Sequence, residues 1–481
     1  MNLKEKTLHG LRWSFIDNFA NQGVTFLVGI ILARLIEPAE FGILGMIAIF
    51  TAIAGAFVNS GLSTALVRKN DCTSVDYSTV FYFNIVVSVV AYFILFFASP
   101  YIAHFFGEPR LTAITRVCCL SIIIGAFSAI QSTLLTKKIN FKAQAKISVT
   151  SSIIAGVIAI ILAYKGMGVW SLVWRGVIGG VATCIFLWLQ SNWRPILVFS
   201  KQSFKELFGF GSKLLASGLL DTIYNNIYYP IIGKYFSAAT LGFYTRAQSF
   251  SNLFSSVLTG NIQRVSFPVL SSIQDNQEQL KGGYRKIVKS TMLVTFSLML
   301  GLAAVAKPLI VVLIGEKWLP CVPYLQLMCF SAMLYPLHAI NLNILQVKGR
   351  SDIFLKLEIA KKIMAIPLII IGILLGVEAL LIGTILYSIL AYFLNSYFSG
   401  KLIYYTVHSQ LKDILPLLLV AAFVSLLAWG ITLFHFSNLA TLSLQIAVGG
   451  ILTIGIYEFL KQPDYLEMKT IVIENLKKLK R

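Results

Sequence analysis

The sequence predicts an all-α polytopic membrane protein with about fourteen transmembrane helices, arranged as two pseudo-symmetric six-helix lobes plus two C-terminal helices. Apolar residues make up 57% of the 481 positions and charged residues only 12%, whereas a soluble domain carries roughly a quarter charged residues. Mean hydropathy is +0.79. The apolar residues form runs of about 20, long enough to cross a hydrocarbon core ~30 Å thick. This composition excludes a soluble globular protein.

The expected spans follow one another with short connections, so no large extramembrane domain is expected. The first six lie at residues 14–36, 41–67, 77–99, 112–135, 145–164 and 168–189. The next six lie at 214–236, 241–270, 288–314, 324–347, 362–376 and 379–400, and the last two at 414–434 and 439–460. The segment 362–376 is short, so we extend it toward Leu357, with Lys361 and Lys362 reaching back to the interface. The first segment is expected to be a retained helix and not a cleaved signal peptide, because polar residues interrupt its apolar run.

Basic residues alternate between the two sides of the predicted membrane topology. Of the 40 Lys and Arg residues, 30 fall on the side of the N-terminus and 6 on the opposite side. The positive-inside rule then places both termini in the cytoplasm. Because topology accounts for the basic excess, we do not expect nucleic acid as a partner.

Two parts of the chain resemble each other, which indicates an internal duplication. Residues 33–42 (ARLIEPAEFG) align with residues 233–242 (GKYFSAATLG), and each segment connects the first and second span of its set. Residues 129–131, Lys138, Lys146 and Gly166 align with residues 339–341, Lys348, Lys356 and Gly376 at an offset of 210. Duplicated halves around a central site are a transporter architecture. The predicted domains are residues 1–199, 200–410 and 411–481, the last holding two helices and a basic amphipathic tail.

The cysteines and histidines give no sign of a metal site or cofactor. The six cysteines form no C-x-x-C pair and lie away from any histidine at zinc-ligand spacing. Most of them fall within apolar spans, where a thiol behaves as a small core residue. His338, inside the tenth span, is the one histidine placed to shuttle protons, although a core histidine is the alternative. We expect neither a metal nor a cofactor.

Three segments carry a family resemblance: residues 8–14 (LHGLRWS), 32–42 (LARLIEPAEFG) and 61–67 (GLSTALV). They resemble Wzx-type polysaccharide repeat-unit flippases of the polysaccharide transporter family, within the multidrug/oligosaccharidyl-lipid/polysaccharide exporter superfamily. The likeness is strongest to the colanic acid and teichuronic acid exporter branch. It is densest over residues 8–69 and extends more loosely through both predicted lobes.

The resemblance implies a flippase that moves a polyprenyl-diphosphate-linked oligosaccharide repeat unit across the bacterial cytoplasmic (inner) membrane. Such proteins work by alternating access of two lobes and are not enzymes. The expected partners are a lipid-linked oligosaccharide and membrane lipids, with the polysaccharide polymerase and export machinery as further candidates. The family shares no universal catalytic signature, so the site residues must be chosen from this sequence itself.

Polar side chains recur at spacings of three and four in the first and seventh spans. Asp17 and Asn21 belong to the stripe of the first span, and Asp221 to that of the seventh. A carboxylate near the middle of a membrane costs ~2.5–3.5 kcal/mol on insertion scales and tends to mark a functional path. We therefore predict that Asp17, Asn21 and Asp221 line a cavity and couple transport. The alternative is hydrogen bonding between helices.

Arginines and amides in other spans are the candidate substrate ligands. In the eighth span Arg246 and Arg264 lie eighteen residues apart, hence on one face and about 27 Å apart along the axis. A guanidinium can hold a diphosphate through two hydrogen bonds. The predicted substrate-binding set is Arg246, Arg264, Arg175, Asn225 and Asn252. The alternatives are snorkelling to the interfaces and structural ion pairs.

Three other classes of protein remain as alternatives. A drug exporter of the same superfamily would share the twelve-helix core, although the two extra helices favour the polysaccharide branch. A membrane glycosyltransferase or polymerase would need a sizeable outer loop with catalytic groups, and the expected outer loops are short. A scaffold that transports nothing would carry costly charged residues in its spans without purpose.

Overall fold

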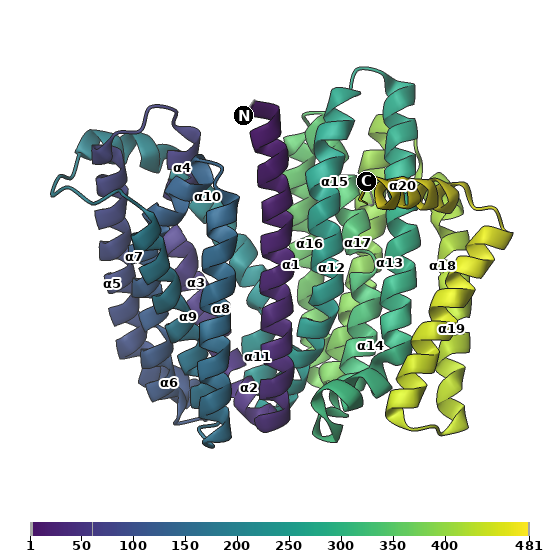
Figure 1. Ribbon diagram of the computed structural model, residues 1–481, viewed down its shortest axis with the longest axis horizontal. Coiled ribbons are helices and arrows are strands. Elements are labelled where there is room, and N and C mark those ends of the chain that lie inside the picture. Colours follow the sequence, from purple (N-terminus) through teal and green to yellow (C-terminus); the bar gives the residue numbers. More distant parts are fainter. Residues whose placement is uncertain (1–2, 60, 480–481) are drawn as a thin grey trace. The chain divides into compact units, whose positions relative to one another are not determined.

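The structure is a computed structural model that describes residues 3–59 and 61–479 (Figure 1). All of the regular secondary structure in these ranges is helical. The chain forms two compact units, Met1–Gly242 and Phe243–Arg481.

The first unit contains eleven α-helices and the start of a twelfth. They are α1 (Leu3–Leu35), α2 (Pro38–Met46), α3 (Ala48–Asn59), α4 (Leu62–Arg68), α5 (Ser74–Phe106), α6 (Leu111–Cys118), α7 (Leu120–Lys137), α8 (Phe141–Tyr164), α9 (Val169–Gln190), α10 (Lys201–Asn226), α11 (Tyr228–Tyr235) and α12 (Ala238–Ser272). The long α12 begins in the first unit and continues into the second.

The second unit is built around the long helix α13. The helices that follow α12 in this unit are α13 (Gln277–Ile314), the 3₁₀ helix η1 (Glu316–Trp318), α14 (Cys321–Ala332), α15 (Tyr335–Val347), α16 (Ser351–Leu375), α17 (Val377–Ile403), α18 (Val407–Gly430), the 3₁₀ helix η2 (Ile431–Phe434), α19 (Asn438–Phe459) and α20 (Pro463–Leu479). Helix α20 lies across the ends of its neighbours and not along them (Figure 1).

Several of the predicted spans have different boundaries in the structure, and the second and seventh illustrate the difference. The second, predicted at 41–67, is divided into α2, α3 and α4, and Gly61 adopts φ +61° before α4. That left-handed conformation favours glycine because it has no Cβ. The seventh was predicted to start at residue 214, but α10 begins at Lys201. The Ser200 hydroxyl there accepts a hydrogen bond from the Ser203 amide and caps the helix.

The prediction of an all-α multi-pass membrane protein is confirmed. Ten helical segments of the described residues are long and apolar enough to cross a membrane. Large apolar side chains project outward from them, as Leu419 does with 61% of its surface exposed and Ile451 with 70%. The four other predicted spans correspond to α1, α10 with α11, α12 and α16. Polar or charged side chains follow much of the length of α1, α10 and α12, and α16 carries Lys356, Glu358, Lys361 and Lys362 in its first half.

Close packing of small residues joins the helices of the first unit. Helices α1 and α8 form one of its most extensive pairs, and Gly156 of α8 allows the close approach. A Cβ atom at Gly156 would lie 2.5 Å from the Val28 side chain. Small residues let transmembrane helices approach closely where lipid removes the hydrophobic driving force.

The core of the second unit is larger and joins α13 to α15, α17 and α18. Tyr284, Phe296 and Leu337 are buried there with Tyr405 and Ile414. Helix α20 docks on the same unit through ion pairs to α13: Lys289 Nζ lies 2.7 Å from Asp464 Oδ2, and Lys286 pairs with Glu467. The basic tail that the sequence predicts therefore contains a docked helix over its described residues.

The two aligned repeat segments contact each other reciprocally within the first unit. A Cβ atom on Gly42 would lie 1.7 Å from the carbonyl oxygen of Ala238, and one on Gly242 would lie 1.9 Å from that of Pro38. Gly42 and Gly242 are the positions that the sequence alignment equates. Only glycine fits at either position, because each backbone packs directly on the other.

Candidate functional site

Asn21 of the predicted stripe on α1 makes a contact with the neighbouring helix. The Ser152 hydroxyl of α8 donates a hydrogen bond of 2.5 Å to Asn21 Oδ1. This is the interhelical bond that the alternative interpretation expects. The side chain of Asp17 lies outside the described residues. The coupling role of both residues stays a prediction.

Helix α10 carries Asp221 and Asn225 one turn apart, and both are exposed. Beside them the Asn226 amide donates a hydrogen bond of 2.8 Å to the Thr222 carbonyl oxygen. An exposed carboxylate one turn from an exposed amide leaves acceptor and donor groups on the same helix face. Their predicted role is not decided by this placement.

Arg246 of α12 lies against an aromatic pair. Its guanidinium carbon is 5.7 Å from the centroid of the Trp318 ring, and Phe243 contacts the same ring edge-on at 6.0 Å. Trp318 is fully buried, so its ring gives the guanidinium of the half-buried Arg246 a fixed aromatic surface to lie against. Asn252 is exposed on the same helix, about 9 Å further along the axis. The side chain of Arg264 lies outside the described residues.

The other arginines in spans have different surroundings. Arg175 of α9 is half-buried, and its neighbours Val173 and Gly176 line a cavity of about 240 Å³. Arg116 donates a hydrogen bond of 3.1 Å to the Ser99 hydroxyl and lies 4.2 Å from the centroid of the Phe96 ring. These contacts give Arg116 a structural role, whereas Arg175 remains a predicted ligand.

A buried polar network in the second unit was missed by the sequence analysis. The Tyr284 hydroxyl donates a hydrogen bond of 2.7 Å to Asn341 Oδ1, and the Ser399 hydroxyl donates to the same oxygen. The Ser396 hydroxyl donates a bond of 3.0 Å to Gln410. Asn341, Ser396 and Ser399 are polar residues inside predicted spans, so the sequence held a signal for them, whereas Tyr284 and Gln410 lie outside the predicted spans. Satisfied bonds of this kind hold the second unit rigid.

Lys361 was expected to reach the membrane interface, but the structure buries it. Its side chain is 6% exposed, and among the described residues it is the one buried Lys or Arg. It pairs with Glu358 one turn earlier in α16 and interacts electrostatically with His338 of α15. The His338 ring is in turn 3.0 Å from the Ser388 hydroxyl.

The helix ends near residues 68–76 carry a cluster of charges. Lys69 Nζ lies 3.2 Å from Asp76 and 3.0 Å from Glu206. The hydrogen bond to Glu206 raises the pKa of Lys69 above its ordinary value. Arg68 stacks on Phe210 of α10, with 4.5 Å between its guanidinium carbon and the ring centroid. We call the region around Arg68 and Lys69 the basic end of the first unit.

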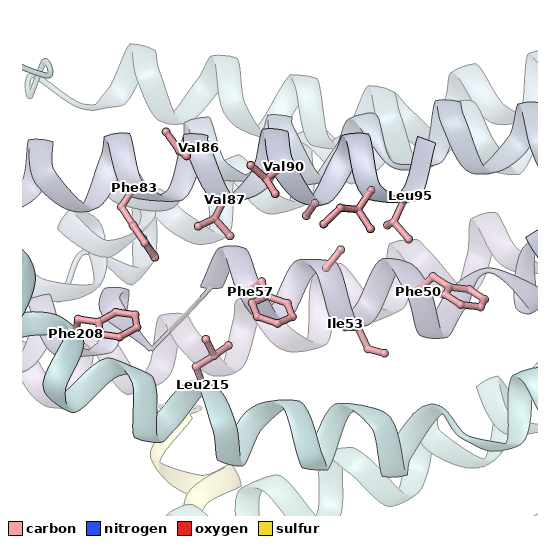
Figure 2. A pocket seen from close by; sticks show the side chains of 13 residues that line it. Phe50, Ile53, Phe57, Phe83, Val86, Val87, Val90, Leu95, Phe208 and Leu215 are labelled. Carbon is pink, nitrogen blue, oxygen red and sulfur yellow. The ribbon is translucent and has the colours of Figure 1, made fainter. Parts of the chain in front are cut away.

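An apolar groove runs along the first unit between α3, α5 and α10 (Figure 2). Its volume is about 490 Å³, and its walls are Phe, Val, Ile, Leu and Ala side chains. Phe50, Ile53 and Phe57 come from α3, while Phe208 and Leu215 come from α10. The sequence analysis missed the groove, because neighbouring apolar spans look alike whether or not a gap separates them.

Three charged residues hold the opposite ends of the first unit's helices together. Arg110 pairs with Glu40 at 2.8 Å and with Glu108 at 2.9 Å. Glu40 also accepts a hydrogen bond of 2.8 Å from the Val169 amide. The hydrogen bond from Arg110 holds the pKa of Glu108 below its ordinary value. The lone glutamates that the sequence places in short loops thus brace those loops.

Comparison with known proteins identifies the family. Residues 31–323 match a family described as polysaccharide biosynthesis protein, which is more than half of the chain. The chain belongs to this family. Membership confirms the resemblance that the three sequence segments indicated.

Two similar proteins show how far the likeness of this chain to known proteins extends. The teichuronic acid biosynthesis protein TuaB of Bacillus subtilis is 24% identical over 93% of this chain and 94% of its own length. The lipopolysaccharide biosynthesis protein WzxC of Escherichia coli is 26% identical over 83% of this chain and 81% of its own. The likeness to TuaB includes nearly the whole of both proteins.

Among solved structures, the fold is similar to that of the lipid II flippase MurJ in an inward closed conformation. The two align with a TM-score of 0.75 at 15% identity, over 94% of this chain and 100% of the other. This likeness shows that the chain has the same fold as MurJ.

Proposed function

We propose that this protein moves a polyprenyl-diphosphate-linked oligosaccharide repeat unit from the inner to the outer leaflet of the bacterial cytoplasmic membrane. The observation that carries the proposal is one chain that combines a polysaccharide biosynthesis sequence with the fold of a lipid flippase. When sugars are joined to lipid on one side of the membrane and used on the other, polysaccharide biosynthesis needs a step that moves the lipid-linked sugars across. A flippase supplies that step. The moving parts are two lobes that open alternately to each side.

The proposed topology has fourteen spans. The ten apolar helical segments supply ten of them, and α1, α10 with α11, α12 and α16 supply the rest. The lobes are residues 1–199 and 200–410, followed by the helices of 411–481. Both termini lie in the cytoplasm, as the distribution of Lys and Arg indicates. Helices α1, α10 and α12, which carry polar groups along much of their length, are suited to line an aqueous path, because lipid would penalise those groups.

We propose two kinds of site residue for this transport. Arg246, Arg264, Arg175, Asn225 and Asn252 bind the diphosphate and sugar hydroxyls, since guanidinium groups pair with phosphate through two hydrogen bonds. Asp17, Asn21 and Asp221 line the path and couple transport to its driving ion. The placement of Arg246 against the buried Trp318 supports the first role, because the ring orients the guanidinium.

Transport without covalent chemistry fits the fold better than catalysis does. The two similar proteins are named for polysaccharide biosynthesis, and the similar structure is that of a flippase. A small-molecule exporter is the second candidate, because exporters of the same superfamily would share the helical core. The polysaccharide family match favours the lipid-linked substrate over a drug.

The proposal is tested by deleting the protein and analysing lipid extracts by mass spectrometry. We expect a lipid-linked oligosaccharide to accumulate and surface polymer to disappear. Arg246→Ala and Asp221→Ala are expected to reach the membrane at normal levels but restore less than a tenth of the polymer. Arg116→Ala, which alters a structural arginine, is the control expected to retain activity in proportion to its membrane level. Normal polymer in both site variants would remove those residues from the path, and no accumulated lipid in the deletion strain would refute the flippase.

A further inference from the structure

The apolar groove of the first unit is elongated along the helices. On α5 its lining extends from Phe83 to Leu95, which is about 18 Å along the axis. On α3 the lining runs in the opposite chain direction, from Phe57 toward the Phe83 end to Phe50 toward the Leu95 end, and Phe83, Val87 and Leu95 point toward α3 (Figure 2). A groove parallel to membrane-spanning helices has the direction of a lipid chain.

The chemistry of the groove excludes a polar occupant. All thirteen lining residues are apolar, whereas a bound water needs two to four polar partners. A sugar would need still more hydrogen-bonding groups. A flexible hydrocarbon chain needs only close contact with the side chains, which the aromatic and branched residues provide.

One end of the groove leads toward the basic end of the first unit. Phe83 and Phe208 lie at this end (Figure 2), with 6.1 Å between their ring centroids. Phe204 continues the aromatic contacts, 5.0 Å from Phe208 and 4.9 Å from Phe83. Helix α10 therefore carries an aromatic path from the groove toward its own N-terminus, beside Arg68 and Lys69.

The cations near this end differ in how far they are neutralised. Lys69 contacts two carboxylates, so its charge is compensated. Arg68 lies over the Phe210 ring, which leaves its charge in place. Lys205 and Lys213 are exposed on α10, one turn from Phe208 and Phe210 respectively. The groove therefore has Arg68 and Lys205 beside its Phe208 end and Lys213 further along α10. Such an arrangement complements an anionic group on a long hydrocarbon chain.

We propose that this groove binds the polyprenyl chain of the lipid-linked substrate, while Arg68, Lys205 and Lys213 attract its diphosphate. The proposal rests on the proposed function, and it adds where the lipid part of the cargo is held. The groove is lined by residues of the first unit alone, whereas Arg246 and Asn252 of α12 belong to the second. The lipid chain and the sugars are therefore assigned to different residues.

The test compares two substitutions that differ only in their relation to the groove. Val90 lines the groove and is 52% exposed, and Val157 of α8 is 51% exposed and does not line it. Val90→Trp fills the gap, whereas Val157→Trp adds the same bulk elsewhere. Native mass spectrometry of the full-length protein measures retention of a long-chain polyprenyl diphosphate, with phosphatidylglycerol as the competing lipid.

We expect Val90→Trp to weaken polyprenyl diphosphate binding at least tenfold and Val157→Trp to leave it within twofold of wild type. Equal binding by all three proteins would overturn the proposal. So would displacement by an equal amount of phosphatidylglycerol, because the groove would then be an ordinary lipid contact. If Val90→Trp loses binding yet makes normal surface polymer, the groove does not carry the cargo, although the flippase function stands.

A second pair of ligands tests the diphosphate contact. The wild type is expected to prefer polyprenyl diphosphate over the neutral polyprenol, and Arg68→Gln with Lys213→Gln is expected to reduce that preference at least fivefold. Binding of polyprenol itself should stay unchanged, which shows that the groove remains folded. An unchanged preference in the double variant would overturn the role of the cations.

Discussion

At the scale of single residues, the buried charge of Lys361 shows what sequence reasoning can and cannot reach. The sequence predicted that Lys361 lies at the end of a short span and that its ammonium group reaches the membrane interface. The structure instead buries it beside Glu358 and near His338. A lysine at a helix end and one inside a helix bundle look the same in sequence, because their difference lies in which neighbouring helix covers them.

The pair predicts a specific pattern of stability. Glu358→Gln should destabilise the protein by about 1–3 kcal/mol, because it leaves a buried ammonium group without its carboxylate. Replacing both residues, as Glu358→Gln with Lys361→Met, should recover most of the loss, since an apolar side chain needs no partner. Thermal unfolding of the detergent-solubilised protein measures the effect.

Glu206→Gln is the matched control for this experiment. It also removes a carboxylate from a lysine, but Glu206 is 59% exposed, and exposed ion pairs contribute about 0–1 kcal/mol. If Glu358→Gln unfolds at the same temperature as Glu206→Gln, the buried pair does not stabilise the fold. A double variant less stable than Glu358→Gln would show that Lys361 acts through another contact.

At the scale of helices, hydrophobic runs predicted where the chain crosses the membrane but not where each helix bends. Runs of apolar residues are interrupted too little to reveal the separation of α2, α3 and α4, which depends on Gly61 and on packing against α10. The early start of α10 was also hidden, because its first three turns are basic and amphipathic. The internal repeat stays a prediction from the sequence, and the structure adds that its aligned glycines, Gly42 and Gly242, both lie at tight contacts.

The reciprocal contact of the repeats makes a prediction about glycine. Gly42→Ala and Gly242→Ala should each lower stability by about 1–3 kcal/mol or more, as overpacked sites do, because the new methyl group would overlap a backbone carbonyl. Thermal unfolding and the amount of protein in the membrane measure this effect.

Gly125→Ala is the control, because a Cβ atom there has no neighbour within 4 Å. In a helix interior alanine is favoured over glycine by about 1 kcal/mol, so this variant should be neutral or more stable. Wild-type stability of Gly42→Ala would mean that the two repeat segments do not pack as closely as the structure has them.

At the scale of the whole molecule, the sequence predicted the class of protein and its family, and the structure supplied the groove. Composition and loop charge reflect the membrane as a solvent, so the class of protein and a topology could be predicted from them without coordinates. The groove depends on gaps between helices that are distant in sequence, as are Phe50, Phe83 and Phe208. The candidate ligand residues are intermediate between these two cases. The sequence showed that they are polar, but it did not show which side chains surround them.

The central claim is that the protein carries a lipid-linked oligosaccharide from the inner to the outer leaflet. The most direct measurement exposes intact spheroplasts to a membrane-impermeant reagent that oxidises sugars, then counts modified lipid-linked oligosaccharide by mass spectrometry. With the wild-type protein, we predict that most of this lipid is modified within minutes. Without it, or with Arg246→Ala, the lipid should stay protected until the membrane is broken. Equal modification with and without the protein would contradict the account.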